Sequence, residues 1–270
     1  MRLRPASSTA KPSVRLAAAA LLGALALLPS AAHAYDPALR WYALRTEHFD
    51  VTFHEGLAHF AQRAAKDLEA AHALLVPAMG HAPSRRVLVV ISDDTDFANG
   101  SATAYLRPTM RLFAAPPDDR SELNDYDDWV FNLIVHEHTH ILHLDQVYGI
   151  PAAVNALFGR ILQPNGMQPD WIVEGYAIYH ESLFSSGGRS RSSLFDMYLR
   201  TEVLEDVPFG IDDASNAPVR WPRGSIGYLH GAQLIPFATA RYGDAMLVGI
   251  SRDYGSRLIP YAVNLSAEEV

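Results

Sequence analysis

Residues 129–144 read Trp-Val-Phe-Asn-Leu-Ile-Val-His-Glu-His-Thr-His-Ile-Leu-His-Leu, and this stretch decides the fold that the sequence predicts. Positions at steps of three and four share one face of a helix, and here that face consists of Trp129, Leu133, His136, His140 and Leu144. Apolar residues occupy most of the other positions, so we expect the helix to be buried. Asn124 or Asp125 is its expected N-terminal cap, and residues 149–151 (Gly-Ile-Pro) are its expected end.

The spacing of two histidines on this helix indicates a metal site. His136 and His140 are four positions apart, so both imidazoles can point at one metal ion. Glu137 lies one step round the helix, beside the ion, where its carboxylate can accept the proton of a metal-bound water. The alternative is a set of core histidines that hydrogen-bond to one another or to the backbone. Burying these polar side chains without a function would be costly, so we favour metal-assisted hydrolysis.

A zinc site in a hydrolase needs a third protein ligand and an open fourth position. The chain contains no cysteine, so His, Asp or Glu must supply that ligand. Glu174 is the best candidate, because it belongs to a predicted helix at 171–184, capped by Asp170, that can return antiparallel to the first. Gly175 next to it has no side chain and would let two helices approach closely. The alternative for Glu174 is an exposed acid on a helix surface.

The residues before the histidine helix have the patterns of a small sheet. Residues 41–53 predict a hairpin, residues 86–92 a buried strand and residues 110–115 a further strand. Residues 56–79 predict an amphipathic helix between the hairpin and the next strand, and residues 93–108 predict a loop.

The second half of the chain is predicted to be mainly helical. We expect helices at 152–162, 171–184, 194–205, 225–242 and 244–254. The fold class is therefore α+β, with a small sheet from the first 115 residues packed on a largely helical remainder and the metal held between helices.

The first 34 residues have the pattern of a secretory signal peptide. A basic start without acids is followed by an apolar stretch of 13 residues, Leu16 to Leu28, and by a small-x-small site that ends at Ala34. This stretch is shorter than the roughly 20 residues of a membrane-spanning helix. We expect cleavage after Ala34, a mature chain of residues 35–270 without a membrane span, and a bacterial protein that is periplasmic or secreted.

The mature chain would have 18 basic and 30 acidic residues, a net charge of −12. Nucleic-acid binding depends on Lys and Arg that neutralise phosphates, so this charge argues against such a partner. The absence of cysteine and of a GxSxG motif excludes the common acyl-transfer nucleophiles, and no phosphate-binding glycine loop is present.

The end of the sequence suggests that the natural chain continues. Residues 266–269 (Ser-Ala-Glu-Glu) have the pattern of a capping box, which predicts that a helix begins four residues before Val270. We therefore expect the domain at 35–270 to be truncated at its C-terminus and to be followed by further residues.

The two helix motifs resemble those of the gluzincin metallopeptidases, the thermolysin and aminopeptidase type, in which HExxH is followed by WxxEGxA. More narrowly, the chain is similar to bacterial peptidase MA-like domains, some of which are joined to a downstream β-propeller. The matching residues are His136, Glu137, His140, Trp171, Glu174, Gly175 and Ala177. The resemblance implies a thermolysin-like fold, Zn²⁺ held by His136, His140 and Glu174, and a peptide or protein substrate.

The resemblance also implies a side chain that stabilises the oxyanion, contributed by the helical C-terminal part. Tyr228 and His230 are the candidates for this catalytic role. Thermolysin-like enzymes have an Asp one turn after the third ligand that supports a histidine, whereas this chain has Ile178 there, which leaves Asp145 as a candidate. The GAMEN-like strand of aminopeptidases is absent, so exopeptidase activity is not indicated.

The sequence therefore predicts zinc-dependent hydrolysis of peptide bonds in an extracytoplasmic compartment, with Glu137 as the general base. The strand at 110–115 would bind an extended peptide by edge pairing. The alternative is a catalytically silent, zinc-stabilised binding or assembly module of a larger envelope protein. Such a module has no need of Glu137, and its presence favours the enzyme.

Overall fold

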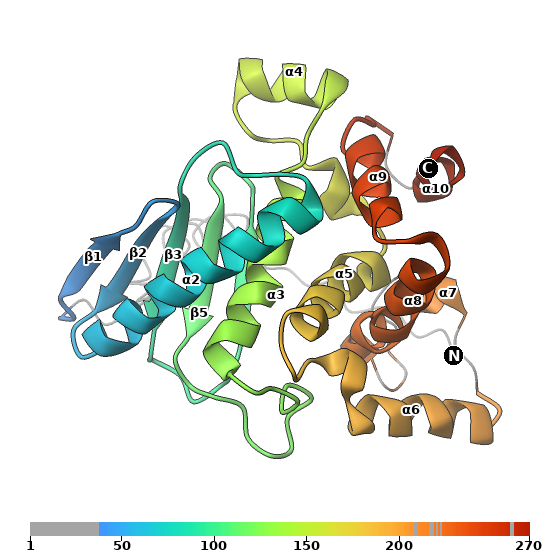
Figure 1. Cartoon of the computed structure of the whole chain (residues 1–270), viewed down its shortest axis with the longest axis horizontal. Coiled ribbons are helices and arrows are strands. Elements are labelled where there is room, and N and C mark those ends of the chain that lie inside the picture. The colour runs from blue at the N-terminus through green and yellow to red at the C-terminus, as the bar shows by residue number, and fades with distance from the viewer. Residues whose placement is uncertain (1–37, 208–209, 216–218, 220, 222, 260–261) are drawn as a thin grey trace, which may run out of the picture. The chain divides into compact units, whose positions relative to one another are not determined.

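The computed structural model describes residues 38–207, 210–215, 219, 221, 223–259 and 262–270. The predicted signal peptide lies outside these residues. Within them, no helix is both long enough and apolar enough to cross a bilayer. The fold is α+β, as predicted, with a five-stranded sheet from the N-terminal part followed by a mainly helical part (Figure 1).

The sheet has the strand order β1-β2-β3-β5-β4. The predicted hairpin is confirmed, because β1 (Trp41–Arg45) pairs antiparallel with β2 (Phe49–His54). β3 (Val87–Ser92) is parallel to both β2 and β5 (Thr109–Phe113). β4 (Gly100–Thr103) is antiparallel to β5 and lies at the edge of the sheet.

β4 corrects two predictions. The sequence predicts a loop over residues 93–108, because Gly-Ser-Ala-Thr has little strand propensity of its own, and pairing with β5 makes these four residues a strand. This pairing covers β5 on the side away from β3. The strand predicted at 110–115 therefore has no free edge for a peptide, and the strand with an unpaired side in this part of the described sheet is β4.

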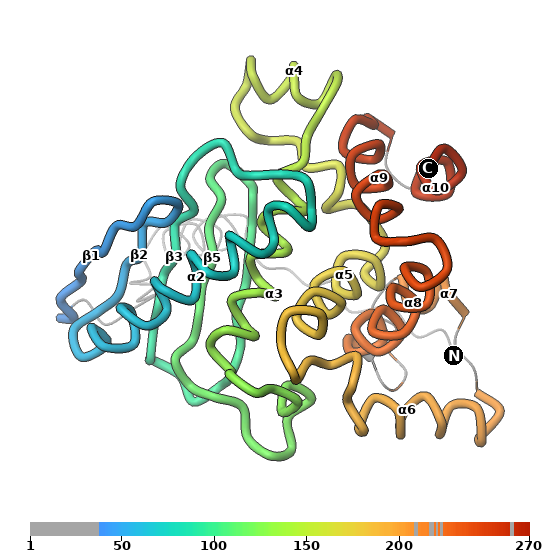
Figure 2. The backbone as a smooth tube through the Cα atoms, viewed as in Figure 1, coloured from blue at the N-terminus to red at the C-terminus, as the bar shows by residue number. Residues whose placement is uncertain are grey.

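Two long helices, α2 (Ala58–Met79) and α3 (Trp129–Leu144), pack on each other and on the strands (Figure 1). α2 connects the parallel strands β2 and β3, which require such a crossover. α3 contacts β4 and β5, after a long segment between β5 and α3 that loops away from the sheet (Figure 2).

The ends of α3 differ from the prediction. Its N-cap is Asp128, whose carboxylate accepts hydrogen bonds from the backbone N–H groups of Val130 and Phe131 at 3.1 and 3.3 Å. Asn124 and Asp125 lie in the segment before this cap and do not perform that role. The helix ends at Leu144, and residues 149–151 begin α4 (Gly149–Phe158), the helix predicted at 152–162.

The C-terminal part is built from helices, and those predicted at 171–184, 194–205, 225–242 and 244–254 are confirmed within a few residues. Its elements are η1 (Pro164–Met167), α5 (Asp170–Leu183), η2 (Arg189–Arg191), α6 (Ser193–Leu204), α7 (Ile211–Ala214), η3 (Arg223–Ser225), α8 (Ile226–Tyr242), α9 (Ala245–Tyr254) and α10 (Val263–Glu269). Ser266 is buried inside α10, so the predicted start of a helix at residue 266 is wrong.

α5 lies between α3 and α8 and contacts both (Figure 1). Two glycines allow α5 and α8 to touch through their backbones. A Cβ atom at position 231 would lie 2.5 Å from the carbonyl oxygen of Trp171 and 2.7 Å from the Cα atom of Gly175. The close approach predicted for Gly175 therefore occurs, and its partner is α8.

We predict that Gly231→Ala destabilises the protein by about 1–3 kcal/mol, because the added methyl group forces two packed helix backbones apart. The measurement is the free energy of unfolding in urea. Gly224→Ala is the matched control, since a Cβ atom there meets nothing within 4 Å. Equal stability of the two variants would contradict the proposed backbone contact.

Candidate metal centre

His136 and His140 lie one turn apart on α3, on the side that faces α5. Their Nε2 atoms are 3.1 Å apart, and their rings are nearly perpendicular, at 88°. Both side chains are buried. The helical spacing of four thus brings the two nitrogens to one point, as predicted.

Glu174 on α5 completes the group. Its Oε2 atom is 3.4 Å from Nε2 of His136 and 3.3 Å from Nε2 of His140. A tetrahedral ion with bonds of about 2.0–2.1 Å separates its ligand atoms by about 3.3–3.4 Å. The three distances match this spacing, and among the described residues these side chains form a group able to hold a metal ion.

The hydrogen bonding of these side chains also fits a cation. Oε2 of Glu174 is buried and forms no hydrogen bond with any described residue. The Nε2 atoms of His136 and His140 both face this oxygen and are only 3.1 Å apart, so two N–H groups there would repel each other. A cation, in contrast, accepts a lone pair from each of the three atoms. Burial raises the pKa of Glu174, and the adjacent His140 and His136 lower that pKa by more, so its carboxylate is ionised.

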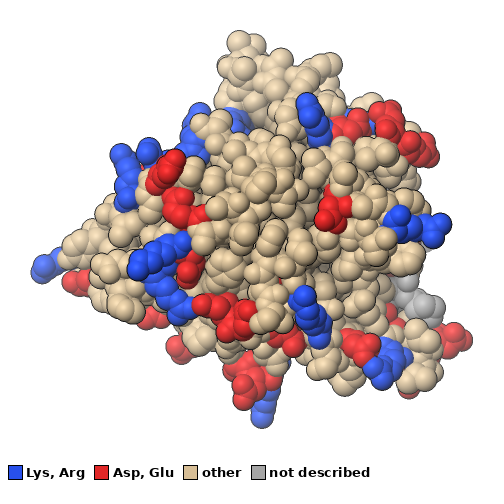
Figure 3. Space-filling view, in the orientation of Figure 1, with Lys and Arg blue, Asp and Glu red and all other residues tan. Residues whose placement is uncertain are grey.

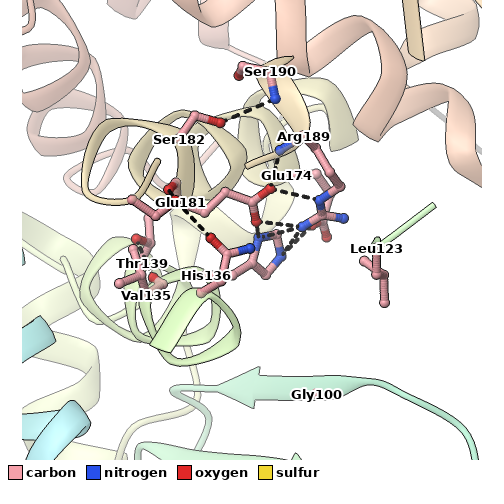
Figure 4. Close-up of polar contacts among 12 residues, drawn as sticks. Gly100, Leu123, Val135, His136, Thr139, Glu174, Glu181, Ser182, Arg189 and Ser190 are labelled. Atoms are coloured by element: carbon pink, nitrogen blue, oxygen red, sulfur yellow. Dashed lines mark hydrogen bonds and ion pairs between the residues drawn. The ribbon is translucent and has the colours of Figure 1, made fainter. Parts of the chain in front are cut away.

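A second buried carboxylate, that of Glu181, contacts the other ring nitrogen of His136. Oε2 of Glu181 lies 3.0 Å from Nδ1 of His136, and Arg189 donates to Glu181 from its backbone N–H and its Nε, both at 2.9 Å. Figure 4 shows the guanidinium of Arg189 beside both the imidazole and the carboxylate. When Nε2 of a histidine binds a metal, its Nδ1–H donates to such an acceptor, which fixes the ring.

The charges of this network depend on one another. Burial raises the pKa of Glu181, but Arg189 and His136 lower it to about 2. Burial and Arg189 lower the pKa of His136, and the carboxylates of Glu174 and Glu181 raise it by more, to about 9. The carboxylates therefore make the surroundings of His136 favourable for positive charge, either a proton or a metal ion.

Glu181 and Arg189 were missed by sequence reasoning. The position predicted from the resemblance, Ile178, is buried in a small apolar cluster. Asp145 is also buried but pairs with His81 and Arg160. The sequence did contain a signal for Glu181, because it follows Glu174 by seven residues, two turns along the same face of α5.

Glu137 is buried beside the two histidines and lines the same cavity. Burial raises the pKa of its carboxyl, although His136 and His140 act to lower it. Gly100 of β4 presses against this side chain: a Cβ atom there would lie 2.7 Å from Oε1 of Glu137. β4 therefore limits the positions available to the carboxylate.

Tyr228 and His230, the two residues predicted to stabilise the oxyanion, lie in different surroundings. Tyr228 lines the cavity, with the guanidinium of Arg189 5.2 Å from its ring centre. Burial, followed by the charge of Glu174, raises the pKa of Tyr228, so its hydroxyl keeps its proton. His230 is not among the residues that line the cavity and faces Glu202, with 3.4 Å between Nε2 and Oε2. The structure thus brings Tyr228, and not His230, to the metal ligands.

The remaining histidines near the motifs are packed elsewhere. His138 lies on the opposite side of α3, with its Nε2 atom 3.0 Å from Nδ1 of His72. The ring of His143 packs edge-on against Tyr176, and the ring of His180 stacks on Phe184. All three are buried, and none of them is among the residues that line the cavity with His136 and His140.

The three candidate metal ligands line a cavity of about 630 Å³. β4 and the residues just before it form one wall, and the segment between β5 and α3 contributes Ser121, Glu122, Leu123 and Asp125. α8 contributes Tyr228 on another side. The cavity is therefore large enough to admit several residues of a peptide beside the three ligands.

No family model matches the chain, and no curated protein matches it either. The assignment of a metal centre to this protein therefore rests on the geometry and chemistry of its own residues.

We predict that His136→Ala, His140→Ala and Glu174→Ala each abolish tight binding of a divalent metal and lower the midpoint of thermal unfolding of the metal-loaded protein, because metal binding stabilises the folded state. Metal content after gel filtration and unfolding curves measure the two effects. Retention of one equivalent of metal by all three variants would disprove the ligand set.

We also predict that Glu181→Gln weakens metal affinity by about 10- to 100-fold, because His136 loses its charged acceptor. Competition with a chromophoric chelator measures the affinity. Glu202→Gln is the matched control, since Glu202 is also a buried carboxylate that faces a histidine but lies away from the metal ligands. If both variants bind the metal equally well, Glu181 does not support the site.

Proposed function

We propose that this protein is a zinc-dependent peptidase of the gluzincin type, related in architecture to the thermolysin-like enzymes. The observation that carries the proposal is the buried carboxylate of Glu137 in the same cavity as the group of His136, His140 and Glu174. A site that only stabilised the fold would not need a second acid beside its ligands, and burying that acid is costly.

Zinc suits this ligand set better than the other common metals. Two imidazoles and one carboxylate are the ligands of many catalytic zinc sites, and three protein ligands leave a position open toward the cavity. Calcium and magnesium prefer sets of oxygen ligands, which these residues do not provide. When bound, zinc would supply Lewis acidity, which polarises a carbonyl group and lowers the pKa of water toward about 7.

Glu137 is the proposed general base. Its buried carboxylate has a raised pKa, which brings its proton affinity closer to that needed near neutral pH. It can accept a proton from water at the open side of the ligand group and later give that proton to the leaving amine. The contact with Gly100 holds the carboxylate close to its working position.

Tyr228 is the proposed donor to the oxyanion. A protonated phenol in the cavity donates a hydrogen bond to negative charge that develops on the carbonyl oxygen of the substrate. The guanidinium of Arg189 lies over its ring, and its charge is balanced by Glu181. Arg189 therefore also orients the ring of Tyr228.

A peptide in an extended conformation is the proposed substrate. Residues 100–102 of β4 line the cavity, and β4 is an edge strand, so its backbone can pair with a peptide strand laid along it. Pairing with β4 recognises the backbone of the substrate, so it would bind an extended polypeptide whatever its sequence. The signal-peptide pattern of the first 34 residues supports action in the periplasm or outside the cell.

We predict that Glu137→Gln retains zinc and the fold but loses hydrolysis of an unstructured, casein-like substrate by at least about 10²-fold, because the amide cannot accept the proton. Removal of the metal from the wild type should abolish the same activity, and zinc should restore it. Glu122→Gln is the control, because Glu122 also lines the cavity but is not part of the ligand group, and it should retain activity within a few-fold.

Equal rates for wild type and Glu137→Gln would contradict the peptidase mechanism. Zinc binding by both proteins without any hydrolysis would instead support the binding or assembly module of a larger envelope protein.

A further inference from the structure

α4 is an apolar helix with few contacts to the rest of the protein. It stands away from the neighbouring helices and strands (Figure 1). Leu157 is 76% exposed, Phe158 67% and Ile150 62%, and of the ten residues of α4 only Pro151 is buried. A helix that buries so little of its own apolar surface needs another reason to be apolar.

A neighbouring loop enlarges this apolar surface. The backbone N–H of Leu106 donates to the carbonyl oxygen of Arg160, at 2.9 Å, which fixes the loop beside the end of α4. Leu106 has a φ of 60°, an unfavourable value for a leucine, and its side chain is largely exposed. We call the surface formed by the exposed side chains of both segments the apolar tip; it consists of Tyr105, Leu106, Ile150, Leu157, Phe158 and Ile161.

The apolar tip offers almost no polar group to a partner. Asn155 is the polar side chain of α4, and it bonds inward to the backbone of Ile161 and Leu162. No charged residue occurs from Gly149 to Gly159. In the space-filling view, the end formed by α4 shows neither positive nor negative side chains, whereas both kinds are spread over the rest of that face (Figure 3).

The two segments that contain the apolar tip carry few charged residues. The chain as a whole is acidic, yet residues 97–117 and 146–169, which contain the tip, include no acidic residue. Their charged residues are Arg107, Arg111 and Arg160, and ion pairs with Asp50 and Asp145 balance the charges of Arg107 and Arg160. Exposed aliphatic side chains together with tyrosine and phenylalanine are typical of surfaces that enter the interfacial region of a bilayer.

A second copy of the chain fits the apolar tip less well. A stable protein interface needs about 800 Å² on each partner. α4 has ten residues and is therefore about 15 Å long and about 10 Å wide, so one face of the helix covers only about 150 Å². A projecting helix without hydrogen-bonding groups also lacks the polar rim of such interfaces.

We infer that the apolar tip inserts into the interfacial region of phospholipid bilayers, and that it holds the protein at a membrane surface. The described residues contain no helix able to span a membrane, so this attachment would be peripheral. The inference is independent of the proposed hydrolysis, since none of the tip residues is a metal ligand or lines the cavity.

The test is co-sedimentation of the purified protein with vesicles of phosphatidylcholine and phosphatidylglycerol. Phe158→Glu should lower the partition coefficient about tenfold or more, because a charge replaces an inserted aromatic ring. Phe237→Glu is the matched control, since Phe237 on α8 is 66% exposed, and it should bind like the wild type. Both substitutions are at exposed positions and should leave the circular dichroism spectrum unchanged.

Three results would overturn the inference: no vesicle binding by the wild type, an equal loss in both variants, or a dimer in solution that Phe158→Glu abolishes. Hydrolysis of a casein-like substrate free in solution should be the same in Phe158→Glu and in the wild type. Failure of vesicle binding and failure of the peptidase proposal are therefore separate outcomes.

Discussion

The carboxylate of Glu181 is the group on which the candidate metal centre depends, because it joins three parts of the chain that are distant in sequence. It belongs to α5, accepts hydrogen bonds from Arg189 in η2, and lies against His136 of α3. A buried carboxylate is stable only with such partners, and loss of any one leaves uncompensated charge in the interior. The ion pair thus links α5 to α3 and orients the imidazole of His136, a candidate metal ligand.

The part of the site that lies on a single helix could be predicted from the spacing of residues in the sequence. His136, Glu137 and His140 share α3, so the period of the helix determines their relation. Glu174 could be predicted only from a motif in a second helix. The packing of the two helices, and not local spacing, sets its distance to the two histidines. The α+β class followed in the same way from alternating and helical patterns along the chain.

Features that depend on non-local contacts could not be predicted in this way. β4 is a strand because β5 pairs with it, and Gly-Ser-Ala-Thr alone gives no such signal. Arg189 reaches His136 across 53 residues from the segment between the helices predicted at 171–184 and 194–205. Several acids precede α3, and only the backbone geometry selects Asp128 as the cap. Tyr228 and His230 are two positions apart and so point to different sides of α8. The helical period alone therefore predicts that only one of the two can face the cavity.

The contact between Gly100 and Glu137 also has a genetic consequence. Every amino acid other than glycine has a Cβ atom, and at position 100 this atom would lie 2.7 Å from a carboxylate oxygen and 2.9 Å from a side-chain carbon of Leu133. Each missense mutation of this codon, even the one to alanine, therefore adds an atom where no space exists. The position of the Glu137 carboxylate thus depends on the codon for Gly100, which lies 37 triplets upstream and encodes a residue without a side chain.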